Sequence, residues 1–143
     1  MMNLISITRA VTAAIVCSVT ITSQAEVVVV VGSRSPVTSL TKAQISDLYL
    51  GRAKDFPNGG GAALTAMIAS GPAKDDFFEK VLSKTDSQAR SIWARLVFTG
   101  IGTGPKELGD AHQMKKLLAT NPNVIGFLDK ADVDGQVKVV YSP

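Results

Sequence analysis

The segment Val27-Val28-Val29-Val30-Val31-Gly32 decides the fold class, because a run of consecutive valines favours a strand. β-Branched side chains fit the pleated surface of a sheet, and an unbroken apolar run places them on both of its faces. Such a strand has to be covered on both sides. The segment therefore predicts a sheet with helices packed against it, which is an α/β layered architecture.

Further strands are expected where short apolar runs lie between turn-forming residues. These runs cover Leu64–Ile68, Val124–Leu128 and Val137–Tyr141. The glycine-rich segment Thr99–Gly109 is expected to be a loop. Because helical patterns separate most of these strands, the chain is expected to form one layered sheet with flanking helices.

Four helices are predicted between the strands, and their expected starts are Thr41, Pro72, Thr85 and Asp110. The first and third begin with a capping box, in which a threonine is followed three residues later by a glutamine. The second begins with a proline, which suits the first helical position. The third helix is expected to carry one apolar stripe, made of Ala89, Ile92, Trp93, Leu96 and Val97.

The N-terminal segment, residues 1–25, has the pattern of a signal peptide. Arg9 precedes an uncharged apolar stretch, and Ser23-Gln24-Ala25 places small residues at the two positions that signal peptidase reads. The sequence thus predicts cleavage after Ala25, a periplasmic location and one domain over residues 26–143. An N-terminal anchor or a buried strand is the alternative reading.

The amino-acid composition excludes several classes of function. The 143 residues include 15 Lys+Arg, 12 Asp+Glu, one His and one Cys, with a net charge of +3. One cysteine forms no internal disulfide, and one histidine leaves no zinc-type cluster. The charge is too small and too dispersed to indicate a nucleic-acid partner. The sequence indicates a protein without a metal or a cofactor.

Catalytic patterns are weak. His112 lies at the polar start of the last predicted helix, where a solvated histidine is the simpler interpretation. Asp75 and Asp76 suit the positive end of a helix, and Asp132 and Asp134 suit a solvated turn. We therefore expect a protein that is not an enzyme, since no nucleophile and base are paired in the sequence.

An anion site is expected at Ser70-Gly71-Pro72, between a predicted strand and a predicted helix. Free backbone N–H groups and the helix dipole favour an oxyanion at such a place. The Ser70 hydroxyl, the amides of Ala73 and Lys74, and the Lys74 ammonium are the candidate donors, although Pro72 removes one N–H. An ordinary helix start is the alternative interpretation.

A second group of polar residues follows the first predicted strand. Ser33, Arg34 and Ser35 come directly after the valine run. Ligands of α/β sheets bind at the carboxyl ends of strands. We therefore expect these residues to join Ser70 and Gly71 around the same anion.

Several segments match a known family in order and spacing, namely Leu40-Thr41 with Gln44-Ile45, Leu48–Gly51, Phe56–Gly59, Trp93, Phe98–Gly100, Gly104-Pro105 and Asn121–Phe127. Together they resemble the phosphate-binding proteins of bacterial ABC importers over nearly all of Val27 to Val140. The resemblance implies a periplasmic-binding-protein-like fold, a phosphate or related oxyanion ligand, and delivery to a membrane permease.

The chain also departs from that family. The family proteins are about twice as long and hold phosphate between two lobes, whereas this chain resembles a short, single-lobe relative. Their anion loop reads Ser-Gly-Thr, and Pro72 stands at the place of the threonine. Their upstream arginine has no counterpart at Met67–Ala69. The alternative function is therefore an envelope interaction module that keeps the fold without the phosphate site, and pairing of two chains to rebuild a cleft stays open.

Overall fold

The computed structural model describes residue 18 and residues 26–143, so the predicted signal peptide lies, apart from Ser18, outside the described residues. The elements in chain order are β1 (Val27–Gly32), α1 (Lys42–Tyr49), η1 (Pro57–Gly59), β2 (Leu64–Ile68), α2 (Pro72–Phe77), η2 (Phe78–Leu82), α3 (Asp86–Phe98), β3 (Lys106–Leu108), α4 (Ala111–Thr120), β4 (Val124–Asp129), η3 (Lys130–Asp132) and β5 (Val137–Tyr141). The predicted strands and helices are all present, and the α/β prediction is confirmed.

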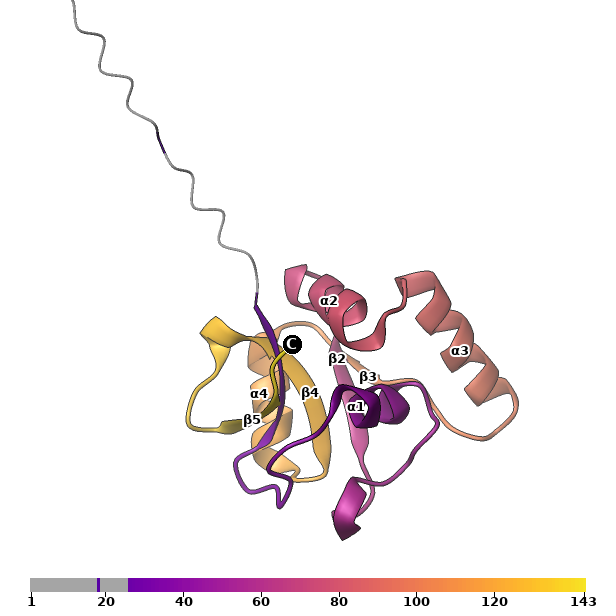
Figure 1. Cartoon of the computed structure of the whole chain (residues 1–143), viewed down its shortest axis with the longest axis horizontal. Helices are drawn as coiled ribbons and strands as arrows, with labels where there is room; N and C mark the ends of the chain where they lie inside the picture. The colour runs from indigo at the N-terminus through magenta and orange to yellow at the C-terminus, as the bar shows by residue number, and fades with distance from the viewer. Residues whose placement is uncertain (1–17, 19–25) are drawn as a thin grey trace, which may run out of the picture.

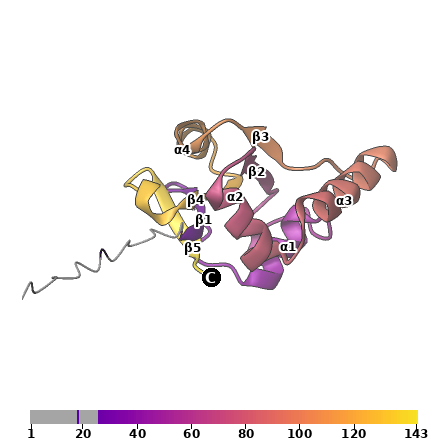
Figure 2. The same cartoon turned by 90° about the horizontal axis from the view of Figure 1, so that it is seen from above.

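The strands form one mixed sheet in the order β3-β2-β4-β1-β5. β2 is parallel to β3 and β4, whereas β1 is antiparallel to β4 and β5. Viewed from above, α4 lies on one side of the sheet, with α1 and α2 on the other (Figure 2). Every residue of β1 is buried, as expected for a strand covered on both faces.

The helix starts follow the sequence closely. Thr41 and Gln44 form a complete capping box, with each backbone N–H donating to the side-chain oxygen of the other residue at 3.0 and 3.2 Å. Thr85 and Gln88 do the same at the start of α3. These contacts span three residues, which explains why the sequence alone was enough to predict them.

An aromatic cluster joins α1 and α2 to the sheet. The Phe77 ring stacks on Phe127 with centroids 4.2 Å apart, and it meets Tyr49 edge-on at 4.8 Å. The buried Tyr49 hydroxyl donates to the carbonyl oxygen of Ala66 at 2.7 Å and reaches that of Ile125 at 3.1 Å. Tyr49 therefore links β2 to β4 from within the core, and its burial raises its pKa.

Two expectations need correction. The predicted loop Thr99–Gly109 contains a short strand, β3, because Lys106–Leu108 pairs with Ala66–Ile68 at the edge of the sheet. In α3, Val97 is 59% exposed and does not join the buried stripe. The reason is that α3 packs outside α1 and α2, at a distance from the sheet, so its C-terminal end has little to pack against (Figure 1).

Candidate functional site

The parallel strands β2 and β3 end side by side, and the chain leaves them toward opposite faces of the sheet. β2 leads into α2 and β3 leads into α4. The two exits are joined by a hydrogen bond from the Ala69 N–H to the Leu108 carbonyl oxygen at 2.9 Å. Open α/β sheets bind ligands at such a switch point, because the diverging loops leave a crevice at the carboxyl ends of the strands.

The exit from β2 presents Ser70 and Gly71 to solvent. Gly71 adopts φ +112°, which favours glycine, and a Cβ built there meets no atom within 4 Å. Pro72 occupies the first helical position, and no side chain of the described residues caps this turn. The backbone N–H groups of Ala73 and Lys74 are thus the first donors that the helix offers to a ligand.

The exit from β3 differs, because its own side chains accept hydrogen bonds from two of its amides. Asp110 Oδ1 accepts a hydrogen bond from the Gln113 N–H at 2.9 Å. Gln113 Oε1 in turn accepts one from the Gly109 N–H at 2.8 Å. Of the two exits, the one at Ser70 and Gly71 is therefore the one without a side-chain cap.

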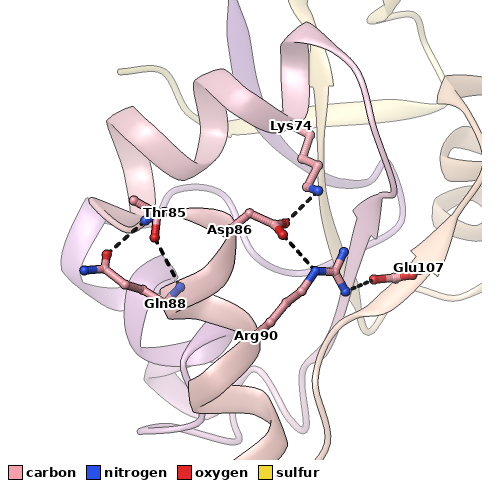
Figure 3. Close-up of polar contacts among 6 residues, drawn as sticks. All are labelled: Lys74, Thr85, Asp86, Gln88, Arg90 and Glu107. Atoms are coloured by element: carbon pink, nitrogen blue, oxygen red, sulfur yellow. Dashed lines mark hydrogen bonds and ion pairs between the residues drawn. The ribbon is translucent and has the colours of Figure 1, made fainter.

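Lys74 directs its charge away from this turn. Its ammonium nitrogen lies 2.7 Å from Asp86 Oδ1 and 5.3 Å from the centre of the Phe78 ring, and its side chain is 11% exposed. Figure 3 shows the side chain reaching toward the start of α3. The structure thus leaves the Lys74 N–H at the predicted site, whereas the ammonium is held by another element.

The Lys74 ion pair belongs to a chain of charges across three elements. Asp86 also accepts a hydrogen bond from Arg90 at 2.9 Å, and Arg90 reaches Glu107 on β3 at 3.0 Å (Figure 3). The hydrogen bonds from Lys74 and then Arg90 lower the pKa of the Asp86 carboxyl. This chain fastens α2 and β3, the two elements of the switch point, to α3.

Ser33, Arg34 and Ser35 lie at the other end of the sheet. Because β1 is antiparallel to β4, Val31 pairs with Ile125, which lies near the first residue of β4. β2 begins beside the same end, with Leu64 opposite Val124. The carboxyl end of β1 therefore meets the amino ends of β2 and β4 (Figure 1). The expectation that both polar groups surround one anion is wrong for this reason.

The turn after β1 has a structural role instead. Ser35 is 4% exposed, and its Oγ accepts a hydrogen bond from the Val37 N–H at 3.2 Å. The Lys138 ammonium donates to the Ser35 carbonyl oxygen at 2.7 Å, and the Ser33 N–H donates to the Gln136 carbonyl oxygen at 3.1 Å. These bonds attach the turn to β5.

A second feature was missed by the sequence reasoning. A hollow of about 710 Å³ lies at the amino end of β2, and its walls include Leu48, Leu64, Thr65, Leu96, Ile101 and Lys106. We call it the β2 hollow. Its residues come from segments far apart in the chain, so no local pattern marks them. The glycine-rich stretch before β3 is the one sequence signal within it.

The fold is periplasmic-binding-protein-like and matches part of several solved structures. Solved structures that share it include an ABC-type phosphate transport receptor from Vibrio cholerae (21% identity, TM-score 0.62) and a putative phosphate ABC transporter substrate-binding protein with bound phosphate from Clostridium perfringens (21%, 0.63). PstS from Borrelia burgdorferi is a more distant example (9%, 0.58). The resemblance expected from the sequence is thus confirmed at the level of structure.

These similarities cover 81% of this chain and 45%, 44% and 46% of the three solved chains, respectively. The chain thus spans less than half the length of the structures it resembles. No protein-family model and no curated protein sequence matches it.

Two features are absent from the described residues. None of their helices has the length and apolar character needed to cross a membrane. Nor do three or more His, Cys, Asp or Glu side chains gather there as a metal site would require.

Proposed function

We propose that this protein is a periplasmic solute-binding protein that binds phosphate or a related oxyanion at the start of α2. The observation that carries the proposal is the open first turn of α2, at the point where β2 and β3 end together. The shared fold supports it, because the solved structures named above include a phosphate transport receptor and a protein with bound phosphate.

Binding at this turn would be non-covalent. The Ser70 hydroxyl and the N–H groups of Ala73 and Lys74 would donate hydrogen bonds to the oxyanion, replacing part of its water shell. The absence of a Cβ at Gly71 lets the anion approach the backbone closely. The positive end of the helix dipole adds a favourable field without a formal charge.

We also propose a location and two partners for this protein. The predicted signal peptide favours the periplasm, and a membrane permease would receive the bound solute. A single lobe offers one wall of a cleft, so a second copy of the chain is the proposed source of the other wall. Light scattering with and without phosphate would detect that pairing.

Isothermal titration with inorganic phosphate tests the site. We expect one phosphate per chain, and Ser70→Ala should weaken binding about tenfold, the effect of losing a hydrogen bond to a charged group. Ser33→Ala is the matched control, because it removes an exposed serine hydroxyl at the opposite end of the sheet. Absence of heat at about 1 mM phosphate would reject the proposal.

A second candidate function is an envelope interaction module that keeps the fold without the anion site. The pairing of Lys74 with Asp86 favours it, because the ammonium group of a residue in this turn is engaged within the protein. Co-purification with an envelope protein, together with no response to phosphate, would support this candidate. A saturable phosphate titration with one site per chain would contradict it.

A further inference from the structure

The β2 hollow exists because β3 is short. β3 begins at Lys106, opposite Ala66, so Leu64 and Thr65 pair with β4 on one side and have no described strand on the other. The chain between α3 and β3 passes around this gap through Ile101 and Gly104 instead of filling it. The result is an opening in the edge of the sheet, at the end opposite to Ser70.

The walls of the β2 hollow are mainly apolar, and part of that surface meets water. Leu64 is 53% exposed and Ile101 is 54% exposed, although both are large apolar side chains. Covering such side chains releases about 25 cal/mol for each Å² of apolar surface removed from water. The volume of about 710 Å³ falls within the usual range of small-molecule sites.

The charged residues of the walls share one sign. Lys54 and Lys106 line the hollow, and no aspartate or glutamate among the described residues does so. Neither lysine forms an ion pair with a described residue. An apolar hollow with two lysines on its wall complements a ligand that has an apolar body and an anionic head.

The positive charge of the walls also indicates which kind of molecule fits the β2 hollow. A second copy docked through the same face would bring lysines against lysines, which opposes pairing. An inorganic anion would leave the apolar walls exposed to water. An amphipathic anion satisfies both features at once.

We infer that the β2 hollow binds a small amphipathic carboxylate, with its acyl chain against Leu64 and Ile101 and its carboxylate beside Lys54 or Lys106. This site is distinct from the proposed oxyanion site, because the two lie at opposite ends of β2. The inference therefore stands or falls independently of phosphate binding.

Titration of the ¹⁵N-labelled protein with octanoate, followed by amide chemical shifts, tests the inference. We expect saturable shifts at Leu64, Ile101 and Gly104, and weaker binding of 1-octanol, which keeps the chain but lacks the charge. Lys54→Met with Lys106→Met should weaken octanoate binding about tenfold. Lys42→Met with Lys116→Met is the matched control, because both are exposed helix lysines outside the hollow.

A variant that fills the β2 hollow with a larger side chain tests octanoate binding without changing the charge of the walls. Thr103 is an exposed loop residue in the wall, so Thr103→Trp should fill the hollow and abolish octanoate binding, whereas Thr103→Ser should retain it. Both variants should keep the unfolding midpoint of the parent. Absence of saturable shifts at about 1 mM octanoate, or equal binding of octyltrimethylammonium, would overturn the inference. A dimer that Thr103→Trp dissociates would also overturn it, in favour of self-association.

Discussion

The ammonium nitrogen of Lys74 lies 2.7 Å from Oδ1 of Asp86, so the start of α3 holds the charge of a residue whose backbone N–H belongs to the proposed anion site. Any oxyanion at the first turn of α2 would be bound by backbone N–H groups and the Ser70 hydroxyl. If the ion pair were broken, Lys74 could turn toward that anion. Mutation of Asp86 can therefore change the affinity for phosphate without altering the residues of the anion site.

Asp86→Asn is expected to strengthen phosphate binding. Loss of the carboxylate frees the Lys74 ammonium, and we expect affinity to rise about two- to fivefold at low salt, the range that an exposed charge produces. Titration calorimetry at two salt concentrations measures the effect. Asp47→Asn is the control, because it breaks the exposed pair with Arg52 on another element. Equal affinity in Asp86→Asn and the parent would contradict a site at α2.

The Asp86 carboxyl should also report the ion pair through its pKa, which Lys74 and Arg90 lower from the ordinary 3.8. A lowered pKa in the folded state means that the stabilisation is present above the unfolded pKa and is lost as pH falls through the folded one. Lys74→Met should raise the pKa of Asp86, measured by ¹³C chemical shifts during acid titration. Lys116→Met should leave it unchanged. An unmoved Asp86 pKa in Lys74→Met would show that the pair is absent in solution.

Pro72→Thr is expected to improve phosphate binding. The substitution restores a backbone N–H at the first helical position and adds a hydroxyl, so affinity should rise about tenfold. Pro122→Thr, in the exposed turn after α4, is the control for a proline removed elsewhere. Calorimetry with phosphate measures both variants. A decrease in affinity for Pro72→Thr with unchanged folding would argue against oxyanion binding at this turn.

Tyr49→Phe should destabilise the fold by about 1–3 kcal/mol, because it leaves buried carbonyl groups of Ala66 and Ile125 without their donor. Urea unfolding followed by the fluorescence of Trp93, whose indole N–H bonds the Tyr49 carbonyl oxygen, measures the change. Tyr141→Phe removes a half-buried tyrosine hydroxyl that forms no described hydrogen bond and should change stability little. Equal effects in both variants would show that the bridge contributes nothing.

Gly32 in β1 and Gly126 in β4 are expected to differ in how well they tolerate substitution by alanine. A Cβ at Gly32 would clash with the Leu118 backbone oxygen, whereas one at Gly126 would clash with the flexible Met114 side chain. Both alanine variants should lose about 1–3 kcal/mol, with Gly32→Ala losing more because a backbone atom yields less. Gly135→Ala, with no atom within 4 Å, is the control. Thermal unfolding ranks the three, and the reverse order would refute the packing argument.

The strands around Val27 and Val124 and both capping boxes could be predicted from the sequence because each depends on neighbours in the chain. The open turn at Ser70 could be predicted for the same reason, since strand, glycine and proline follow one another. β3 could not, because Lys106–Leu108 has no strand pattern of its own and becomes a strand only by pairing with β2.

Local sequence thus determined which segments became strands and helices, because capping and hydrophobic periodicity act over a few residues. Tertiary structure alone decided which polar groups came together. The antiparallel direction of β1 moved Ser33, Arg34 and Ser35 away from Ser70, and the approach of α3 gave Lys74 an acidic partner. Strand direction and ion pairing depend on contacts between distant segments, and those contacts exist only after the chain has packed.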